Sequence, residues 1–187
     1  ATLKDDAWIK DIYKDVEKQS TDNSDLVKLA AVAAEKLNDR DWAKDLLARA
    51  EAQSDTLNEY TLVAGAYLRL LDDREKAIAL YEAAEAQCTD KVSYARLISL
   101  VHGQSADNSF VTRIVISARK KLTGFDDLLF LAETARILLA DTGLASQIFS
   151  QAEATATDTR KLSRLATSLK DRMKDSAWAS RVLRKIA

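Results

Sequence analysis

The chain has no proline and only four glycines among its 187 residues. Tight turns between strands depend heavily on these two residue types, whereas helices are interrupted by proline and weakened by glycine. A chain so poor in both can form few tight turns, and the composition therefore favours an all-helical fold. Apolar residues make up 47% and charged residues 30%, a balance typical of a globular domain rather than a disordered segment.

The sequence is equally poor in the residues of metal and nucleophile chemistry. Cys88 is its only cysteine and His102 its only histidine. A structural zinc site takes about four ligands, and a Cys–His nucleophile needs both groups within reach of each other. The glycine-rich pattern of a phosphate-binding loop is absent as well. We therefore expect no catalytic residue, no metal site and no cofactor.

Neither an excess of positive charge nor a long apolar run is present. Lys and Arg number 28 against 29 Asp and Glu, which gives a net charge of −1. Nucleic-acid binding relies on cations that neutralise phosphates, and a membrane span needs about 20 apolar residues in succession. We expect neither nucleic acid nor a membrane as partner, and a soluble protein that is cytoplasmic by default. Because residue 1 is Ala, we also expect a processed form or a piece of a longer chain.

One pattern is present in six copies. Apolar residues follow a recurring aspartate at offsets of three, four, eight and eleven positions, which places them on one face of a helix. An aspartate just ahead of such a face can accept hydrogen bonds from the free N–H groups of the first helical turn, so capping is favoured over catalysis. The aspartates recur every 34 residues, at Asp5, Asp39, Asp73, Asp107, Asp141 and Asp175.

A second set of apolar columns lies between these helices and recurs at the same interval. The connections are only a few residues long, which forces neighbouring helices to lie antiparallel. We call the helices that follow the aspartates the capped helices and the others the intervening helices. Capped helices are expected at 6–19, 40–53, 74–87, 108–121, 142–155 and 176–186, and intervening helices at 24–37, 58–71, 92–104, 126–140 and 160–173.

The pattern and its interval resemble the tetratricopeptide repeat family, whose unit is a helix–turn–helix of about 34 residues. The family's proline is absent from every unit, which is typical of a divergent branch. The resemblance implies an all-α fold in which residues 1–187 form one domain, a right-handed α-solenoid of about eleven helices in antiparallel pairs. The family's motifs stand at Ala43-Leu47-Ala50, Ala77-Tyr81-Ala84 and Ala145-Phe149-Ala152 in the capped helices, and most closely at Tyr60, Val63, Ala64 and Tyr67 in the intervening helices.

The resemblance also implies a concave groove, lined by the intervening helices, that binds a protein or peptide. Small residues there have a second interpretation, since they would also permit tight curvature. The groove is expected to contain Thr61, Gly65, Leu68, Ala95, Ser99, His102, Leu129, Glu133 and Arg136, continued by Arg160, Ser163, Thr167 and Lys170. If the helices are rotated by one face, it presents instead Leu62, Arg69, Arg96, Phe130 and Ile137.

Tryptophans share one column near the start of the capped helices, at Trp8, Trp42 and Trp178. Packing between units is favoured over a stacking platform for a sugar or base, because the column otherwise holds Lys, Phe and Leu. The fourth unit departs most from the pattern, which suggests either a bend near Gly103 or ordinary drift. The last helix keeps its apolar set with nothing after it to cover it, so we expect a trimmed end, a longer array or end-to-end association.

These observations favour a non-enzymatic scaffold that binds a protein or peptide partner in its groove. The alternative is a structural, self-associating module of a larger assembly, which would associate through the ends of the solenoid. RNA binding by helical repeats is a third interpretation, which the balanced charge disfavours. An enzyme ranks last.

Overall fold

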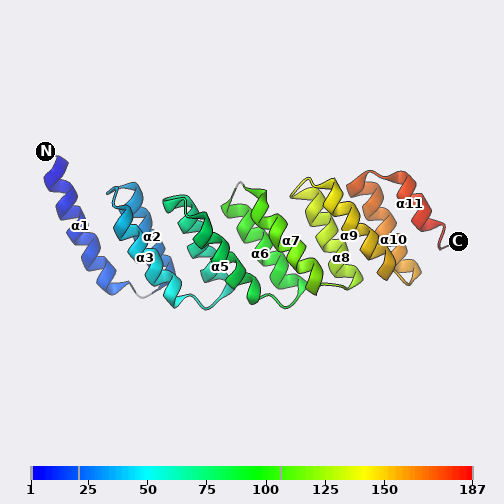
Figure 1. The fold of residues 1–187 in the computed structure, drawn as a ribbon, viewed down its shortest axis with the longest axis horizontal. Helices are drawn as coiled ribbons and strands as arrows, with labels where there is room; N and C mark the ends of the chain where they lie inside the picture. The colour runs from blue at the N-terminus through cyan, green and yellow to red at the C-terminus, as the bar shows by residue number, and fades with distance from the viewer. Residues whose placement is uncertain (1, 21, 106, 187) are drawn as a thin grey trace. The chain divides into compact units, whose positions relative to one another are not determined.

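The computed structural model describes residues 2–20, 22–105 and 107–186, and the side chains of these residues outside 2–7, 9 and 19. This part of the chain is all-helical, as predicted (Figure 1). Its elements are α1 (Thr2–Gln19), α2 (Asn23–Glu35), α3 (Arg40–Gln53), α4 (Leu57–Ala66), the π-helical turn η1 (Tyr67–Leu71), α5 (Arg74–Ala86), α6 (Lys91–Gln104), α7 (Asn108–Lys121), α8 (Phe125–Ile137), α9 (Thr142–Thr155), α10 (Thr159–Ser168), the π-helical turn η2 (Leu169–Met173) and α11 (Ser176–Leu183).

The helix bounds follow the predicted ones closely. The capped helices α3, α5, α7, α9 and α11 begin at a constant interval, each directly after an aspartate. The intervening helices α2, α6 and α8, and the combined segments α4–η1 and α10–η2, begin one residue before their predicted starts. The exception is α1, which begins at Thr2 rather than after Asp5, so its predicted start is wrong. The side chain of Asp5 lies outside the described residues.

Five of the predicted caps are confirmed in the structure. Each aspartate carboxylate accepts a hydrogen bond from a backbone N–H group of the first turn, the group that the helix itself leaves without a partner. The bonds run to Asp39 from Trp42 N (3.0 Å), to Asp73 from Lys76 N (3.0 Å), to Asp107 from Ser109 N (2.8 Å), to Asp141 from Leu144 N (2.8 Å) and to Asp175 from Trp178 N (2.8 Å).

The same aspartates also close the preceding helix. The backbone N–H of Asp39 donates to the carbonyl oxygen of Ala33 at 2.8 Å, across six residues. This closure is one residue wider than a Schellman motif, and the residue before the aspartate takes the left-handed conformation that such a closure needs. Matching bonds run from Asp73 to Tyr67, from Asp141 to Ala135 and from Asp175 to Leu169, and the left-handed residues are Asn38, Asp72, Ala140 and Lys174, with φ between 50° and 60°.

Residue 106, in the turn between α6 and α7, lies outside the described residues. There the N–H of Ser105 donates to the carbonyl oxygen of Val101 at 3.1 Å, the ordinary closure of an α-helix. Val101 occupies the column that accepts the wider bond in the other units. The bend suggested by the fourth unit stays a prediction.

Two compact units make up the fold. The first comprises Ala1–Thr89 with Ser99–Ala106, and the second Asp90–Ile98 with Asp107–Ala187. Within each unit, an intervening helix packs along the capped helix that follows it, α2 on α3 and α4 on α5, and then α8 on α9 and α10 on α11. The largest fully buried side chains are Leu26, Leu46, Leu47 and Tyr67 in the first unit and Tyr94, Leu97, Ile98, Leu131, Ile148, Phe149, Leu165 and Leu169 in the second.

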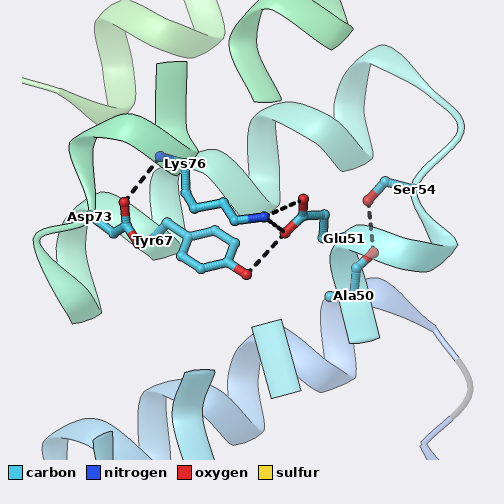
Figure 2. Close-up of polar contacts among 6 residues, drawn as sticks. All are labelled: Ala50, Glu51, Ser54, Tyr67, Asp73 and Lys76. Atoms are coloured by element: carbon cyan, nitrogen blue, oxygen red, sulfur yellow. Dashed lines mark hydrogen bonds and ion pairs between the residues drawn. The ribbon is translucent and has the colours of Figure 1, made fainter. Parts of the chain in front are cut away.

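A half-buried glutamate, Glu51, joins three elements of the first unit by hydrogen bonds (Figure 2). The carboxylate of Glu51, on α3, accepts hydrogen bonds from Lys76 Nζ of α5 at 2.8 and 2.9 Å and from the hydroxyl of Tyr67 in η1 at 3.1 Å. Burial, together with the bond to Glu51, raises the pKa of Tyr67 well above its usual value. The Tyr67 hydroxyl therefore stays protonated and donates throughout the neutral pH range.

Two glutamates at positions equivalent to Glu51, namely Glu17 and Glu153, make similar hydrogen bonds between helices. Glu17 accepts from Trp42 Nε1 at 2.9 Å and also binds Arg49, so it joins α1 to α3. Glu153 accepts from Trp178 Nε1 at 2.6 Å and from Lys185 Nζ at 2.6 Å, so it joins α9 to the C-terminal segment. The column thus links successive capped helices within each unit.

The tryptophans fall into two groups. Trp42 and Trp178 are half-buried and are fixed by their bonds to glutamate, in agreement with the predicted packing role. Trp8 is 67% exposed, so packing is wrong for this residue.

We expect Ala140→Gly to raise the free energy of unfolding by about 1 kcal/mol, because glycine adopts the left-handed conformation without the clash that a Cβ atom causes. Ala140 has φ 53° and is exposed, so no packing is lost. Urea titration measures the change. The matched control is Ala48→Gly, at an exposed position inside α3, which should lower stability by about 0.5–1 kcal/mol. A loss at both positions would contradict the strain assigned to Ala140.

We expect Glu153→Gln to lower the free energy of unfolding by about 1 kcal/mol at neutral pH, because the ion pair with Lys185 is lost. Burial of Glu153 opposes ionisation, but the bonds from Lys185 and Trp178 outweigh it and lower the pKa of the carboxyl group. A lowered folded-state pKa stabilises the protein above the unfolded-state pKa, and this stability disappears as the pH falls through the folded-state value.

The difference between parent and Glu153→Gln should therefore be constant around neutral pH and shrink below about pH 4. Urea titrations across this range measure it. In a double-mutant cycle, adding Lys185→Met to Glu153→Gln should cost little more than either change alone. A difference that persists unchanged in acid would show that the Glu153 charge is not what stabilises this contact.

Candidate functional site

The predicted groove residues of the first unit are partly inside the fold. Thr61 is 1% exposed, and its hydroxyl donates to the carbonyl oxygens of Leu57 and Asn58 in its own helix. Gly65 is buried, and a Cβ atom there would lie 2.9 Å from the side chain of Gln104. The expectation that these two residues line an accessible surface is therefore wrong. Small residues at these positions let neighbouring helices approach closely, which was the second interpretation of the small residues.

Other predicted groove residues lie at the surface. Leu68, in η1, and Ala95, in α6, are half-buried, whereas Ser99 and His102 of α6 are exposed. Leu68, Ser99 and His102 belong to the first compact unit and Ala95 to the second.

The second unit has an open hollow of about 410 Å³ on α8, α10 and η2. We call it the α8–α10 hollow. Four of the predicted groove residues line it, whereas none of the residues of the alternative face does. Its lining consists of Leu129, Glu133, Ser163, Arg164, Thr167, Ser168, Asp171 and Arg172.

Polar contacts fix the walls of the α8–α10 hollow. Ser168 donates its hydroxyl hydrogen to Glu133 Oε1 at 2.7 Å, which joins the end of α10 to α8. Arg164 binds Asp126 Oδ1 at 2.5 Å, and its guanidinium carbon lies 5.5 Å from the centre of the Phe125 ring. The side chains that a ligand would meet are thus held in place before binding.

The ends of α10 are arranged by local chemistry. Asp158 caps the helix by accepting from Lys161 N at 2.8 Å, and this bond with the Lys161 charge lowers the pKa of the aspartate. The Thr167 hydroxyl is turned back to the carbonyl oxygen of Ser163 at 3.0 Å. Arg172 and Asp171 lie in the π-helical turn η2 and are exposed. The hollow therefore offers charges of both signs.

Two predicted groove residues, Leu129 and Arg136, are less accessible to a ligand than expected. Leu129 is 6% exposed, so it forms the floor of the hollow and belongs to the core. Arg136, one turn further along α8, is half-buried, and its Nε has no hydrogen-bond partner among the described residues. Arg136 does not line the hollow.

Four residues of the hollow were missed by the sequence analysis. Arg164, Ser168, Asp171 and Arg172 are spaced by four, three and one positions, and each neighbours or follows a predicted groove position. The buried residues of α10 and η2 are Leu162, Leu165, Ala166, Ser168 and Leu169. Had the predicted groove face included all polar positions opposite these buried residues, it would have contained the missed charged side chains.

The only cysteine and the only histidine, which were considered for metal or nucleophile chemistry, differ in solvent exposure. Cys88 is 3% exposed, with its Sγ 3.8 Å from the carbonyl oxygen of Ala84, whereas His102 is exposed. Within the described residues, no group of three or more His, Cys, Asp and Glu side chains could hold a metal ion. No helix in the same part of the chain has the length and apolar character to cross a membrane.

Comparisons of the chain with protein-family models, with curated proteins and with solved structures found no match.

We expect Leu129→Ala to lower the free energy of unfolding by about 2–3 kcal/mol, because it removes a nearly buried side chain and leaves a cavity. Thr167→Ala, at an exposed position of the same hollow, should change it by less than about 0.5 kcal/mol. Chemical denaturation measures both. Equal effects at the two positions would contradict the assignment of Leu129 to the floor and Thr167 to the accessible wall.

Proposed function

We propose that the chain is a non-enzymatic protein-interaction scaffold, and that the α8–α10 hollow holds a segment of a protein or peptide partner. The observation that supports this proposal best is the chemistry of the hollow. Arg164 and Arg172 offer donors, Glu133 and Asp171 offer acceptors, and Leu129 forms an apolar floor. A polypeptide presents the same three kinds of group, whereas a single small anion or an apolar molecule would use only part of this lining.

The rigidity of the hollow supports the same proposal. Glu133 is already bonded to Ser168, and Arg164 to Asp126, on helices that pack on the α9 and α11 helices. A partner would therefore not have to order these side chains when it binds, which lowers the cost of association.

We further propose that the helix pairs stack as a right-handed solenoid of the tetratricopeptide-like kind. The constant interval between the starts of the capped helices, and the four alike turns with a left-handed residue before the aspartate, support this proposal. Units with equal bounds and equal turns repeat the same local geometry, and repeated geometry generates a superhelix.

A self-associating module is the second candidate. The distribution of charge favours it, since residues 159–187 carry nine Lys and Arg against two Asp and Glu, whereas residues 1–89 carry twelve against nineteen. Opposite net charges in two parts of one chain attract the corresponding parts of another copy.

Filling the α8–α10 hollow tests the scaffold proposal. The double variant Ser163→Tyr/Thr167→Tyr places two large side chains at exposed positions of the hollow wall. The matched control Lys44→Tyr/Ala48→Tyr places the same pair, with the same spacing, on an exposed face of α3. We expect proteins captured from a native lysate by the parent and the control to be retained at least tenfold less by the hollow variant.

Circular dichroism of all three proteins verifies that helicity is unchanged. Binding of the captured partner to the purified proteins is then measured by titration. If the same proteins bind parent, control and hollow variant equally, the hollow is not the binding site.

A further inference from the structure

The outer face of α1 carries apolar side chains that the same columns bury elsewhere. Ile12 is 42% exposed and Val16 is 45% exposed. The equivalent positions in α3, α5, α7 and α9 are all buried, whereas in the last unit the equivalent of Ile12 is buried and that of Val16, Ile186, is half-buried. In the Ile12 column these are Leu46 (0%), Leu80 (4%), Ile114 (3%), Ile148 (0%) and Val182 (0%), and in the Val16 column Ala50, Ala84, Ala118 and Ala152 (0% each).

Trp8, which is 67% exposed, extends this face by one turn. Residues 8, 12 and 16 follow each other at intervals of four, so they form one apolar stripe along the helix. We call Trp8, Ile12 and Val16 the α1 stripe. Large apolar side chains exposed together in this way mark an interaction site on a soluble protein.

The other side of α1 is already occupied within the first unit. Lys10 binds Asp39, and Glu17 binds Trp42 and Arg49, all of which lie at or in α3. At about 100° per residue, Lys10 and Glu17 lie roughly opposite the stripe on the surface of the helix. Because all three side chains of the stripe remain exposed, the stripe is accessible to a partner.

Acidic side chains flank the α1 stripe. Asp11 is three positions after Trp8 and Asp15 is three positions after Ile12, which places both beside the stripe on the helix surface. Both are exposed, and Asp15 binds Lys18 at 2.7 Å. A partner surface should therefore combine an apolar hollow with positive charge.

The C-terminal helix α11 has a surface of this kind. An open hollow of about 460 Å³ is lined there by Asp175, Ala177, Trp178, Arg181 and Arg184. We call it the α11 hollow. The guanidinium carbon of Arg181 lies 5.6 Å from the centre of the Trp178 ring, so the hollow already combines an aromatic face with a cation.

The surroundings of the α11 hollow strengthen its positive charge. Arg181 and Arg184 are exposed, as is Leu183 at 47%. The segment from residue 159 to the C-terminus has seven more positive than negative side chains, and residues 1–89 have seven more negative than positive ones. This charge complementarity selects a second copy of the chain as the occupant.

We propose that the α1 stripe of one copy docks into the α11 hollow of a second copy. Trp8 then stacks against Trp178 and the arginine side chains, Ile12 and Val16 cover the adjoining apolar surface, and Asp11 and Asp15 meet Arg181 and Arg184. The two surfaces differ, so the contact is heterologous, and each bound copy still offers one free surface of each kind. Association of this type continues into chains of copies unless it closes into a ring.

Reversing the charge of one surface at a time tests the proposal. The stripe variant is Asp11→Lys/Asp15→Lys and the hollow variant is Arg181→Glu/Arg184→Glu. Glu35→Lys/Glu75→Lys is the control, since it makes the same change of net charge as the stripe variant at exposed positions elsewhere in the first unit. Sedimentation velocity from micromolar to near-millimolar concentration measures the mass, and circular dichroism verifies the fold of each variant.

We expect the mass of the parent and of the control to rise with concentration, and to rise less in about 0.5 M salt. The stripe variant and the hollow variant should each associate at least tenfold more weakly. Mixed in equal amounts, they should associate again, because the unchanged stripe fits the unchanged hollow and the lysine-bearing stripe fits the glutamate-bearing hollow. Combining all four substitutions in one chain should restore association.

Three results would overturn the proposal. The first is a parent that stays monomeric at every concentration. The second is a hollow variant that associates like the parent, which would indicate pairing between two α1 stripes. The third is a mixture that remains monomeric although the parent associates. Ser163→Tyr/Thr167→Tyr, which fills the α8–α10 hollow, should leave self-association unchanged, so this proposal and the scaffold proposal fail independently.

Discussion

In four of the described turns, the aspartate between an intervening helix and the capped helix after it determines where the two helices meet. Its backbone N–H closes the helix before it, and its carboxylate caps the helix after it, as Asp39 shows with Ala33 and Trp42. One residue therefore satisfies backbone groups at two helix ends, which would otherwise be left without partners. The left-handed residue before it reverses the chain within the turn. A side-chain cap contributes about 1 kcal/mol, but the larger consequence is geometric, because the turn fixes how each helix pair is joined.

Packing and polar ties then build on this turn. With the helix pair fixed, its alanine columns can bury fully, and Ala43, Ala77 and Ala145 are all inaccessible to solvent. Small residues there bring the helices close, and larger ones such as Leu47 and Phe149 fill the space beside them. At the edge of this core, glutamates bridge successive capped helices, as Glu51 does between Tyr67 and Lys76. Such a bridge is half-buried, so it costs less desolvation than a core ion pair and is screened less than a surface pair.

The sequence predicted those features that depend on local chemistry. A carboxylate just ahead of an amphipathic face is a cap wherever the helix stands, and the starts after Asp39, Asp73, Asp107, Asp141 and Asp175 were predicted to the residue. The left-handed conformation of Ala140 was not predictable, because alanine carries no preference for it and the wide closure imposes it. Nor was the burial of Thr61 and Gly65, since it depends on Gln104 and other residues distant in sequence. The candidate site was accordingly predicted only in part: Leu129, Glu133, Ser163 and Thr167 line the hollow, while Arg164 and Arg172 follow from the actual rotation of α10.

Repetition also explains why the two candidate surfaces lie where they do. Inside each unit, equivalent apolar positions such as Leu46 and Ile148 are buried, so these side chains contribute to stability and are not accessible to a partner. Both proposed binding surfaces use positions at which the pattern is broken or left uncovered. The α8–α10 hollow breaks it with larger polar side chains, because Glu133 and Thr167 stand in the column where the first unit has Gly65. The α1 stripe leaves it uncovered, because Ile12 and Val16 keep their apolar character without a covering helix among the described elements. The columns thus show what most equivalent positions do, and the residues that depart from them are the ones on which the two proposals rest.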